Sequence, residues 1–269
     1  MALTIGRAPF TSPLGGTYNF DLESAAPKHI LYLEKVSKRI RGLLAGETII
    51  DTREAMMLHE TGEFIQWYIP MKDVLQAALE PSGQRESDVF KGEKSYYGVR
   101  VGDRFEADAA WSHRDPPQGP SALRDLVAFD FDRLDAWFEE DEEIFDHPRD
   151  PYHRFDCRRT SEPIVVRVGG EKIAETRRAI ILFETSGVPR YYIPLDDVKA
   201  AALSPSETRT ICPYKGGAAY YNVRGGEVTV PDGAWTLPDP FGEAIVVLGH
   251  LSFWGDNTEI YADGRHVPL

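Results

Sequence analysis

An internal duplication constrains the fold of this chain more than any other feature of its sequence. When the sequence is shifted against itself by 124 positions, residues 46–111 align with residues 170–235 without a gap. Of the 66 aligned positions 30 are identical, which is far above chance. Because a repeated segment of this kind marks a repeated fold, we predict two homologous domains.

The extent of the repeat predicts the domain boundaries. We assign residues 1–35 to an N-terminal extension, residues 36–157 to the first domain copy and residues 158–269 to the second. Beyond Trp111 the first copy is expected to carry about seven extra residues before residues 134–145 realign with residues 251–261, which matches Trp137 with Trp254. Two copies of one fold often pack like the subunits of a homodimer, so we expect pseudo-symmetric packing. A scattering profile with two separated lobes would contradict that packing.

Composition excludes several classes of protein. A chain of 269 residues with 42% hydrophobic and 11% aromatic residues can build real cores. Its formal net charge of −13 repels phosphate backbones and no basic patch offsets it, so we expect no nucleic-acid partner. Two cysteines are too few for a disulfide framework or a four-cysteine zinc site. Since the sequence shows neither a secretory pattern nor a long apolar run, we expect a cytoplasmic protein with no membrane partner. We also expect no cofactor.

The pattern of strands and turns predicts a mainly β fold. Residues 163–168 form a β-branched run that stops at Gly169 and Gly170, which indicates a hairpin. Residues 194–203 predict a single helix, with aspartates near its start and alanines inside. Each copy is therefore expected to contain about eight short strands and one helix, in a compact barrel-like or folded sheet.

The motif "ETRRAIILFET…PRYYIP…DV…TICPYKGGAAYYNV…DGAW…P" resembles the bacterial family catalogued as domain of unknown function 427. Residues 131–156 resemble the typical C-terminus of its members, and the two copies cover nearly all of the chain beyond residue 30. The resemblance implies a β-tent fold, as in methionine sulfoxide reductase type B and the drug-binding domain of cereblon. A structural zinc is not implied, because the two CxxC pairs that hold it are missing. The family also carries a nucleotidyltransferase-like label. That reaction needs a Gly-rich phosphate loop or paired carboxylates, and we find neither in this sequence.

The segment "ICPYKGGAAYYNVR" at residues 211–224 contains the candidates for catalysis. Cys212 is a candidate nucleophile, with Lys215 or a Lys215–Tyr220 pair as the accompanying catalytic groups. Its matched position in the first copy is Asp88, so the fold does not require a thiol there. The alternative is that Cys212 is a small residue at a strand edge.

Both copies retain the pattern "KGxxxYYxVR", which favours a binding strand over a nucleophile. Glycine after Lys91 and Lys215 would let a ligand approach the backbone closely, although a turn with a solvated lysine explains it equally. Strand alternation places one tyrosine of each pair in the core and the other beside an arginine. The resulting clusters are Arg190, Tyr192, Tyr220 and Arg224 in the second copy and Gln66, Tyr68, Tyr96 and Arg100 in the first.

Such clusters would suit a small anionic or aromatic ligand, whereas the alternative is a polar strand facing solvent. Trp111 and Trp235 join the binding candidates because β-tent relatives cage ligands with aromatic residues, although matched tryptophans are more often core. A further set, His147, Asp150, His153 and Cys157, has the spacing of metal ligands on a helix. Prolines within that segment forbid a regular helix, so we expect no metal site.

These observations predict a small-molecule binding protein with one polar and aromatic pocket in each domain. One alternative is an enzyme that acts on a small metabolite through Cys212, or Lys215 and Tyr220, in the second copy. The other alternative is a scaffold that acts through protein contacts.

Overall fold

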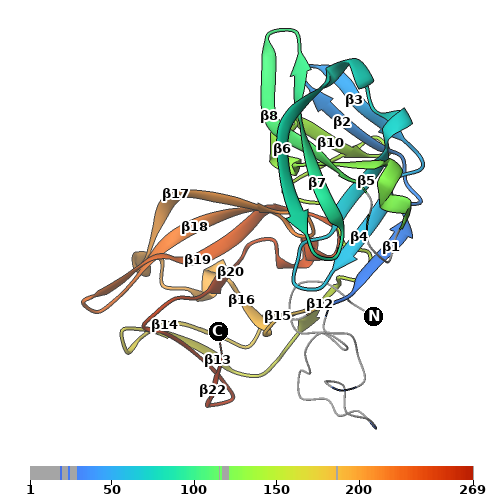
Figure 1. The fold of residues 1–269 in the computed structure, drawn as a ribbon. Helices are drawn as coiled ribbons and strands as arrows, with labels where there is room; N and C mark the ends of the chain where they lie inside the picture. Colours follow the sequence, from blue (N-terminus) through green and yellow to red (C-terminus); the bar gives the residue numbers. More distant parts are fainter. Residues whose placement is uncertain are drawn as a thin grey trace. The chain divides into compact units, whose positions relative to one another are not determined.

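The computed structural model of the protein describes residues 19, 24, 29–114, 116, 121–185 and 187–268. The chain divides into two compact units, Met1–Asp150 and Pro151–Leu269, each built from antiparallel strands (Figure 1). Among the described residues no helix is long and apolar enough to span a membrane.

The first unit contains a seven-stranded and a four-stranded sheet. The order is β1-β4-β5-β9-β8-β7-β6 in the larger sheet and β11-β10-β2-β3 in the smaller one. The strands are β1 (Leu31–Lys35), β2 (Ile40–Leu44), β3 (Glu47–Thr52), β4 (Met56–Glu60), β5 (Gln66–Pro70), β6 (Leu79–Asp88), β7 (Gly92–Val101), β8 (Arg104–Arg114), β9 (Leu126–Phe129), β10 (Ala136–Glu139) and β11 (Glu142–Ile144).

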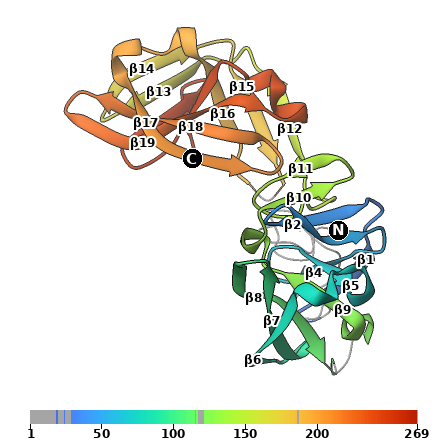
Figure 2. The ribbon, with the colours of Figure 1, turned by 90° about the horizontal axis from the view of Figure 1, so that it is seen from above.

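The second unit repeats this organisation, with a larger sheet β12-β15-β16-β20-β19-β18-β17 and a smaller sheet β14-β13-β21-β22. Figure 2 shows β17, β18 and β19 as long neighbouring strands. The strands are β12 (Phe155–Arg159), β13 (Ile164–Val168), β14 (Glu171–Thr176), β15 (Ile180–Glu184), β16 (Arg190–Pro194), β17 (Leu203–Cys212), β18 (Gly216–Gly225), β19 (Val228–Pro240), β20 (His250–Phe253), β21 (Thr258–Ala262) and β22 (Arg265–Val267). The predicted duplication and mainly β fold are confirmed, with more strands per unit than expected and no closed barrel.

The matched strands keep the 124-residue offset further than predicted. Tyr68 pairs with Ala128 in the first unit, and Tyr192 pairs with Ser252 in the second, so β9 corresponds to β20 at the same offset. The expected insertion of about seven residues is therefore wrong. Strand β1 also starts inside the predicted extension, and β12 pairs with β15 of the second unit, so both boundaries lie a few residues earlier than predicted.

The predicted match between Trp137 and Trp254 is also wrong. Trp137 pairs with Gly42 of β2, whereas Ile260 pairs with the matched residue Val166 of β13. Trp254 instead follows β20 and donates its Nε1 hydrogen to the backbone oxygen of Asp232. The residues around the two tryptophans are similar in type, which produced the incorrect alignment. Strand pairing, and not side-chain type, decides which positions correspond.

Residues 194–203 form two 3-10 turns, η5 (Leu195–Asp197) and η6 (Ala200–Ala202), in place of the predicted helix. Val198 between them is extended, with φ −105° and ψ 137°, and forms a β-bridge with Ala174 of β14. This non-local pairing overrides the local helix preference of the alanines. The first unit shows the same arrangement in η1 (Met71–Asp73) and η2 (Gln76–Ala78).

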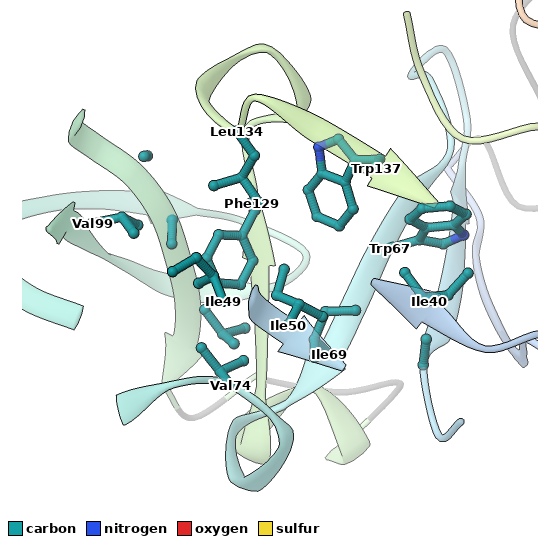
Figure 3. Packing of buried hydrophobic residues seen from close by; sticks show 14 of the residues in the cluster. Ile40, Ile49, Ile50, Trp67, Ile69, Val74, Val99, Phe129, Leu134 and Trp137 are labelled. Atoms are coloured by element: carbon teal, nitrogen blue, oxygen red, sulfur yellow. The ribbon is translucent and has the colours of Figure 1, made fainter. Parts of the chain in front are cut away.

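Apolar side chains cover both faces of the larger sheet. In the first unit the main core joins the two sheets and contains Trp67 and Ile69, with Trp67 and Trp137 rings 5.7 Å apart between centroids (Figure 3). Tyr68 points to the opposite face, where a smaller cluster contains Leu58 and packs against Trp111. Alternation along β5 therefore separates the two faces as predicted.

Candidate functional site

A cavity of about 270 Å³ opens on the face of the first unit's larger sheet that carries the smaller cluster. Side chains from β4, β5, β6, β7 and β8 line it. Lys91, in the β6–β7 turn, forms an ion pair with Glu60 at the end of β4. Because β5, β9 and β8 lie between β4 and β7 in the sheet, the sheet must curl for this pair to form. The curl produces the cavity.

The rim of the cavity, which we define as Glu60, Asp88 and Lys91, is a closed network of charges. The Glu60 carboxylate accepts from Lys91 Nζ and lies 3.0 Å from His29 Nε2. Asp88 Oδ1 accepts the backbone N–H groups of Phe90 and Lys91, both at 2.8 Å, and its Oδ2 lies 2.9 Å from Lys91 Nζ. Burial opposes the charge on Lys91, but the two carboxylates outweigh it and raise the pKa of the amine. The charge of Lys91 is thus matched inside the protein.

The floor of the cavity, which we define as Tyr68, Trp111 and His113, combines buried polar groups with an aromatic ring. The Tyr68 hydroxyl lies 3.1 Å from His113 Nε2, and both residues are at most 2% exposed. Burial raises the pKa of Tyr68, and burial with nearby Lys91 lowers the pKa of His113 to about 4. Both groups are therefore neutral, and one hydrogen bond joins the Tyr68 hydroxyl to Nε2 of the imidazole. The Nδ1 atom of His113 has no hydrogen-bond partner among the described residues.

Lys94 forms one wall of the cavity. Its Nζ lies 4.3 Å from the ring centroid of Trp111 and 4.6 Å from that of Tyr96. Glu86 lies 4.0 Å away, at the limit of an ion pair, and accepts a 2.7 Å hydrogen bond from the Tyr96 hydroxyl. Burial lowers the pKa of Lys94. The wall is therefore a half-buried ammonium group held over two aromatic faces.

The second copy preserves the rim contacts of Glu60 but not those of Asp88, whose matched residue is Cys212. Lys215 Nζ lies 2.6 Å from both carboxylate oxygens of Glu184, and His153 Nε2 lies 3.0 Å from Glu184 Oε1. The His153 ring packs against Tyr214, as His29 stacks on Phe90 in the first copy. Burial favours the neutral form of Glu184, but His153 and Lys215 outweigh it and lower its pKa to about 2.

The floor and wall, in contrast, differ between the copies. Tyr192 and Trp235 are retained, and Trp235 Nε1 donates to the Tyr192 hydroxyl at 3.2 Å. Four polar residues of the first cavity are replaced. Glu86, Asp88, Lys94 and His113 correspond to Thr210, Cys212, Ala218 and Leu237. Since both copies adopt one fold, the fold itself does not require these four polar side chains.

The structure brings part of the predicted first-copy cluster together. Lys91, Tyr68 and Trp111 line the cavity, and Tyr96 contacts it through Lys94. Arg100 does not reach it, because it pairs with Glu80 and lies over the ring of Phe105. Arg100 is four residues along β7 from Tyr96, which is about 13 Å in a strand. Alternation predicted the correct face but could not show this separation.

The second-copy candidates are also separated. Lys215 contacts Glu184, whereas the Tyr220 hydroxyl lies 3.0 Å from Thr210 Oγ1, so the predicted Lys215–Tyr220 pair is not formed. Cys212 is half-buried beside the cluster that contains Tyr192. The guanidinium carbon of Arg190 lies 5.8 Å from the Trp235 ring centroid, and Arg224 donates to the backbone oxygen of Gly226.

The sequence did not identify several residues of the cavity and its surroundings. The 124-residue offset extends back to His29 and His153, a signal that could have revealed the histidine beside Glu60. Lys94 shares the Tyr96 face of β7, but its matched residue is an alanine, so a search for shared residues discards it. The sequence carries no comparable signal for His113. No group of three or more His, Cys, Asp or Glu side chains in the described part of the chain is placed to hold a metal ion.

Comparison with known proteins agrees with the repeat in the structure. A family model described as a domain of unknown function (DUF427) matches the chain twice, at residues 32–140 and 156–264. The two matched ranges begin 124 residues apart and end 124 residues apart, which is the offset that relates β9 to β20. A search of curated proteins found no match.

Proposed function

The chain belongs to the DUF427 family, with two copies in tandem, and we propose that it binds a small polar molecule in the cavity of its first copy. The observation that carries this proposal is His113, which is fully buried at the cavity with an Nδ1 that lacks a protein partner. An unsatisfied buried polar group costs about 1–3 kcal/mol, and such groups require an explanation. A polar ligand that hydrogen-bonds Nδ1, once the side chains that cover this buried atom move aside, supplies one.

The duplication strengthens this argument because it provides an internal control. The second copy has Leu237 at the matched position, packed within an apolar cluster beside Tyr192. An apolar residue therefore satisfies the fold at this site. The histidine in the first copy hydrogen-bonds the buried Tyr68 hydroxyl but leaves its own Nδ1 without a partner, and this uncompensated cost is the pattern expected of a binding residue.

The remaining lining indicates the chemistry of the ligand. Trp111 and Phe64 offer flat apolar surface, while Lys94 and the floor offer hydrogen-bond donors. Carboxylates outnumber ammonium groups around the cavity. The acidic residues are Glu60, Glu63, Glu86 and Asp88, and the basic residues are Lys91 and Lys94. A net negative lining disfavours a free anion, so we infer a planar, uncharged or zwitterionic molecule that both donates and accepts hydrogen bonds.

A thermal-shift screen of small metabolites tests the proposal. A ligand that binds only the native state raises the melting temperature of the full chain. The variant His113→Leu, which installs the residue of the second copy, should abolish the shift, whereas Arg100→Ala, outside the cavity, should retain it. A shift that survives His113→Leu would place binding elsewhere. A broad screen without any stabiliser would favour the scaffold alternative.

The other predictions of function have weaker structural support. The pocket predicted in the second copy stays a prediction. It has weaker support because Leu237 replaces the buried histidine in the matched floor. An enzyme that uses Cys212 needs a group to activate the thiol, and Lys215 is already held by both oxygens of Glu184. Iodoacetamide reactivity no faster than that of free cysteine would remove the thiol-enzyme alternative.

A further inference from the structure

A second cavity, of about 590 Å³, lies in the second unit at the edge of its larger sheet. Strand β12 ends there, next to the start of β15, and Arg159 pairs with Ile180. Strand β16 ends beside the start of β20, where Pro194 pairs with His250. Because these neighbouring strands are antiparallel, their ends meet at one edge and enclose a hollow that is separate from the first-unit cavity.

Arginine side chains dominate the polar lining of this hollow, which we call the basic cleft. Arg178 Nη2 forms a 2.6 Å ion pair with Asp197 Oδ1. Arg159 and Arg177 have no carboxylate within 4.0 Å among the residues that the structure describes, and Arg177 Nη1 only approaches the backbone oxygen of Ser161 at 3.4 Å. The lining of the basic cleft contains no carboxylate, so its arginines leave a local positive charge in a chain of net charge −13. Their planar forks match carboxylate and phosphate groups.

The rest of the basic cleft is apolar. Ile180 and Pro194 are buried behind it, and Val246 of η7 (Gly242–Val247) is 44% exposed at its lip. Ile245 and Leu248, which flank this lip in the sequence, are 59% and 54% exposed. The basic cleft therefore combines two unpaired guanidinium groups with a wall of accessible apolar surface.

The first copy again serves as a control, because it lacks this combination. Arg177 corresponds to Arg53, which is paired with Glu140 through both Nη atoms. Arg178 corresponds to Glu54, a residue of opposite charge that pairs with Lys72. His250 corresponds to Leu126. Arg159 corresponds to Lys35, so the first copy keeps one cation at this edge. It lacks the second unpaired guanidinium group and has a carboxylate in place of Arg178, and in these two respects the basic cleft is specific to the second copy.

We propose that the basic cleft binds an anionic small molecule with an apolar body. Its carboxylate or phosphate group contacts Arg159 and Arg177, and its apolar part lies against Ile180, Pro194 and Val246. This site is independent of the proposed ligand of the first-unit cavity. Its ligand carries the negative charge that the lining of the first cavity disfavours.

Titration of the full chain with phenyl phosphate, benzoate and benzyl alcohol, followed by NMR, tests this inference. At least one of the two anions should bind, and the uncharged alcohol should bind at least about tenfold more weakly, since a charge-assisted hydrogen bond contributes that much. The stronger of the two anions identifies the head group. Binding should weaken as salt screens the exposed arginines. Equal binding of the alcohol, or dissociation constants above about 10 mM for both anions, would overturn the proposal.

Substitutions locate the binding. Arg159→Gln and Arg177→Gln should each weaken binding of the anion about tenfold, because each removes one guanidinium group. Arg53→Gln, the matched change in the first copy, should leave affinity unchanged, and so should His113→Leu. An equal loss in Arg53→Gln would show a non-specific charge effect and contradict the site. If a glutamine variant folds poorly, Arg178→Glu installs the residue of the first copy and should abolish binding, while retained binding would refute the site.

Discussion

Glu184, the second-unit residue that matches Glu60 of the rim, allows a direct test of how much its ion pairs stabilise that unit. Its pKa of about 2 lies below the ordinary value of 4.5 because His153 and Lys215 hold the ionised form against the opposing effect of burial. At 1.36 kcal/mol per pH unit, this difference corresponds to about 3 kcal/mol. The Glu184 side chain is 21% exposed, so solvent screening reduces the expected contribution to about 2 kcal/mol.

The sign of the pH dependence follows from the lowered pKa. The stabilisation is fully present above pH 4.5 and is lost as the pH falls through the folded-state pKa near 2. Glu184→Gln should therefore lower the free energy of unfolding of the second unit by about 2 kcal/mol at pH 7. Because the wild type loses this contribution in acid, the difference between variant and wild type should shrink between pH 5 and pH 3.

Native-state hydrogen exchange resolves the second unit from the first, which bulk denaturation of a two-unit chain does not. A loss of about 2 kcal/mol corresponds to about a 30-fold loss of protection in core strands such as β15 and β16. Glu175→Gln is the control, because Glu175 pairs with Lys172 on the exposed surface and its substitution should leave the protection of these strands unchanged. Equal effects of the two variants, or a difference that does not change with pH, would refute the reasoning.

Three further outcomes are expected. Gly225→Ala should destabilise the second unit by more than about 2 kcal/mol in urea unfolding, because its Cβ would lie 2.0 Å from the backbone oxygen of Val168, whereas Gly217→Ala meets no atom within 4 Å and should be tolerated. His113→Leu should raise or preserve the melting temperature of the unliganded chain while it abolishes ligand shifts; a marked fall would show that the imidazole is structural. Cys157 should react with iodoacetamide more slowly than free cysteine near neutral pH, because burial raises its pKa, and mass spectrometry of the labelled peptides would reveal a faster reaction.

The sequence alone predicted the features that depend on local pattern. The duplication appears in residue identity, and the mainly β character appears in β-branched runs between Gly and Pro turns. Strand alternation correctly separated the paired tyrosines, such as Tyr191 and Tyr192, onto opposite faces of the sheet, because neighbouring side chains of any strand point in opposite directions. Comparison of the copies also identified Lys91 and Lys215, whose matched ion pairs with Glu60 and Glu184 the structure then showed.

The errors arose where a distant segment decides the local outcome. Residues 194–203 contain good helix formers, yet the bridge between Val198 and Ala174 holds the middle of the segment extended. Trp137 and Trp254 look alike in sequence, but pairing across the smaller sheet matches Trp137 with Ile260. In both cases hydrogen bonds between strands far apart in the chain outweigh a local preference.

The cavity itself was decided only by the tertiary structure. Sequence identity between the copies favours residues that both retain, so it discards Lys94 and His113, which distinguish the first copy. Their proximity depends on how the larger sheet curls, since Glu60 and Lys91 meet across three intervening strands. Curvature is a property of the whole sheet that arises from the twist of many strands together, and no short segment encodes it.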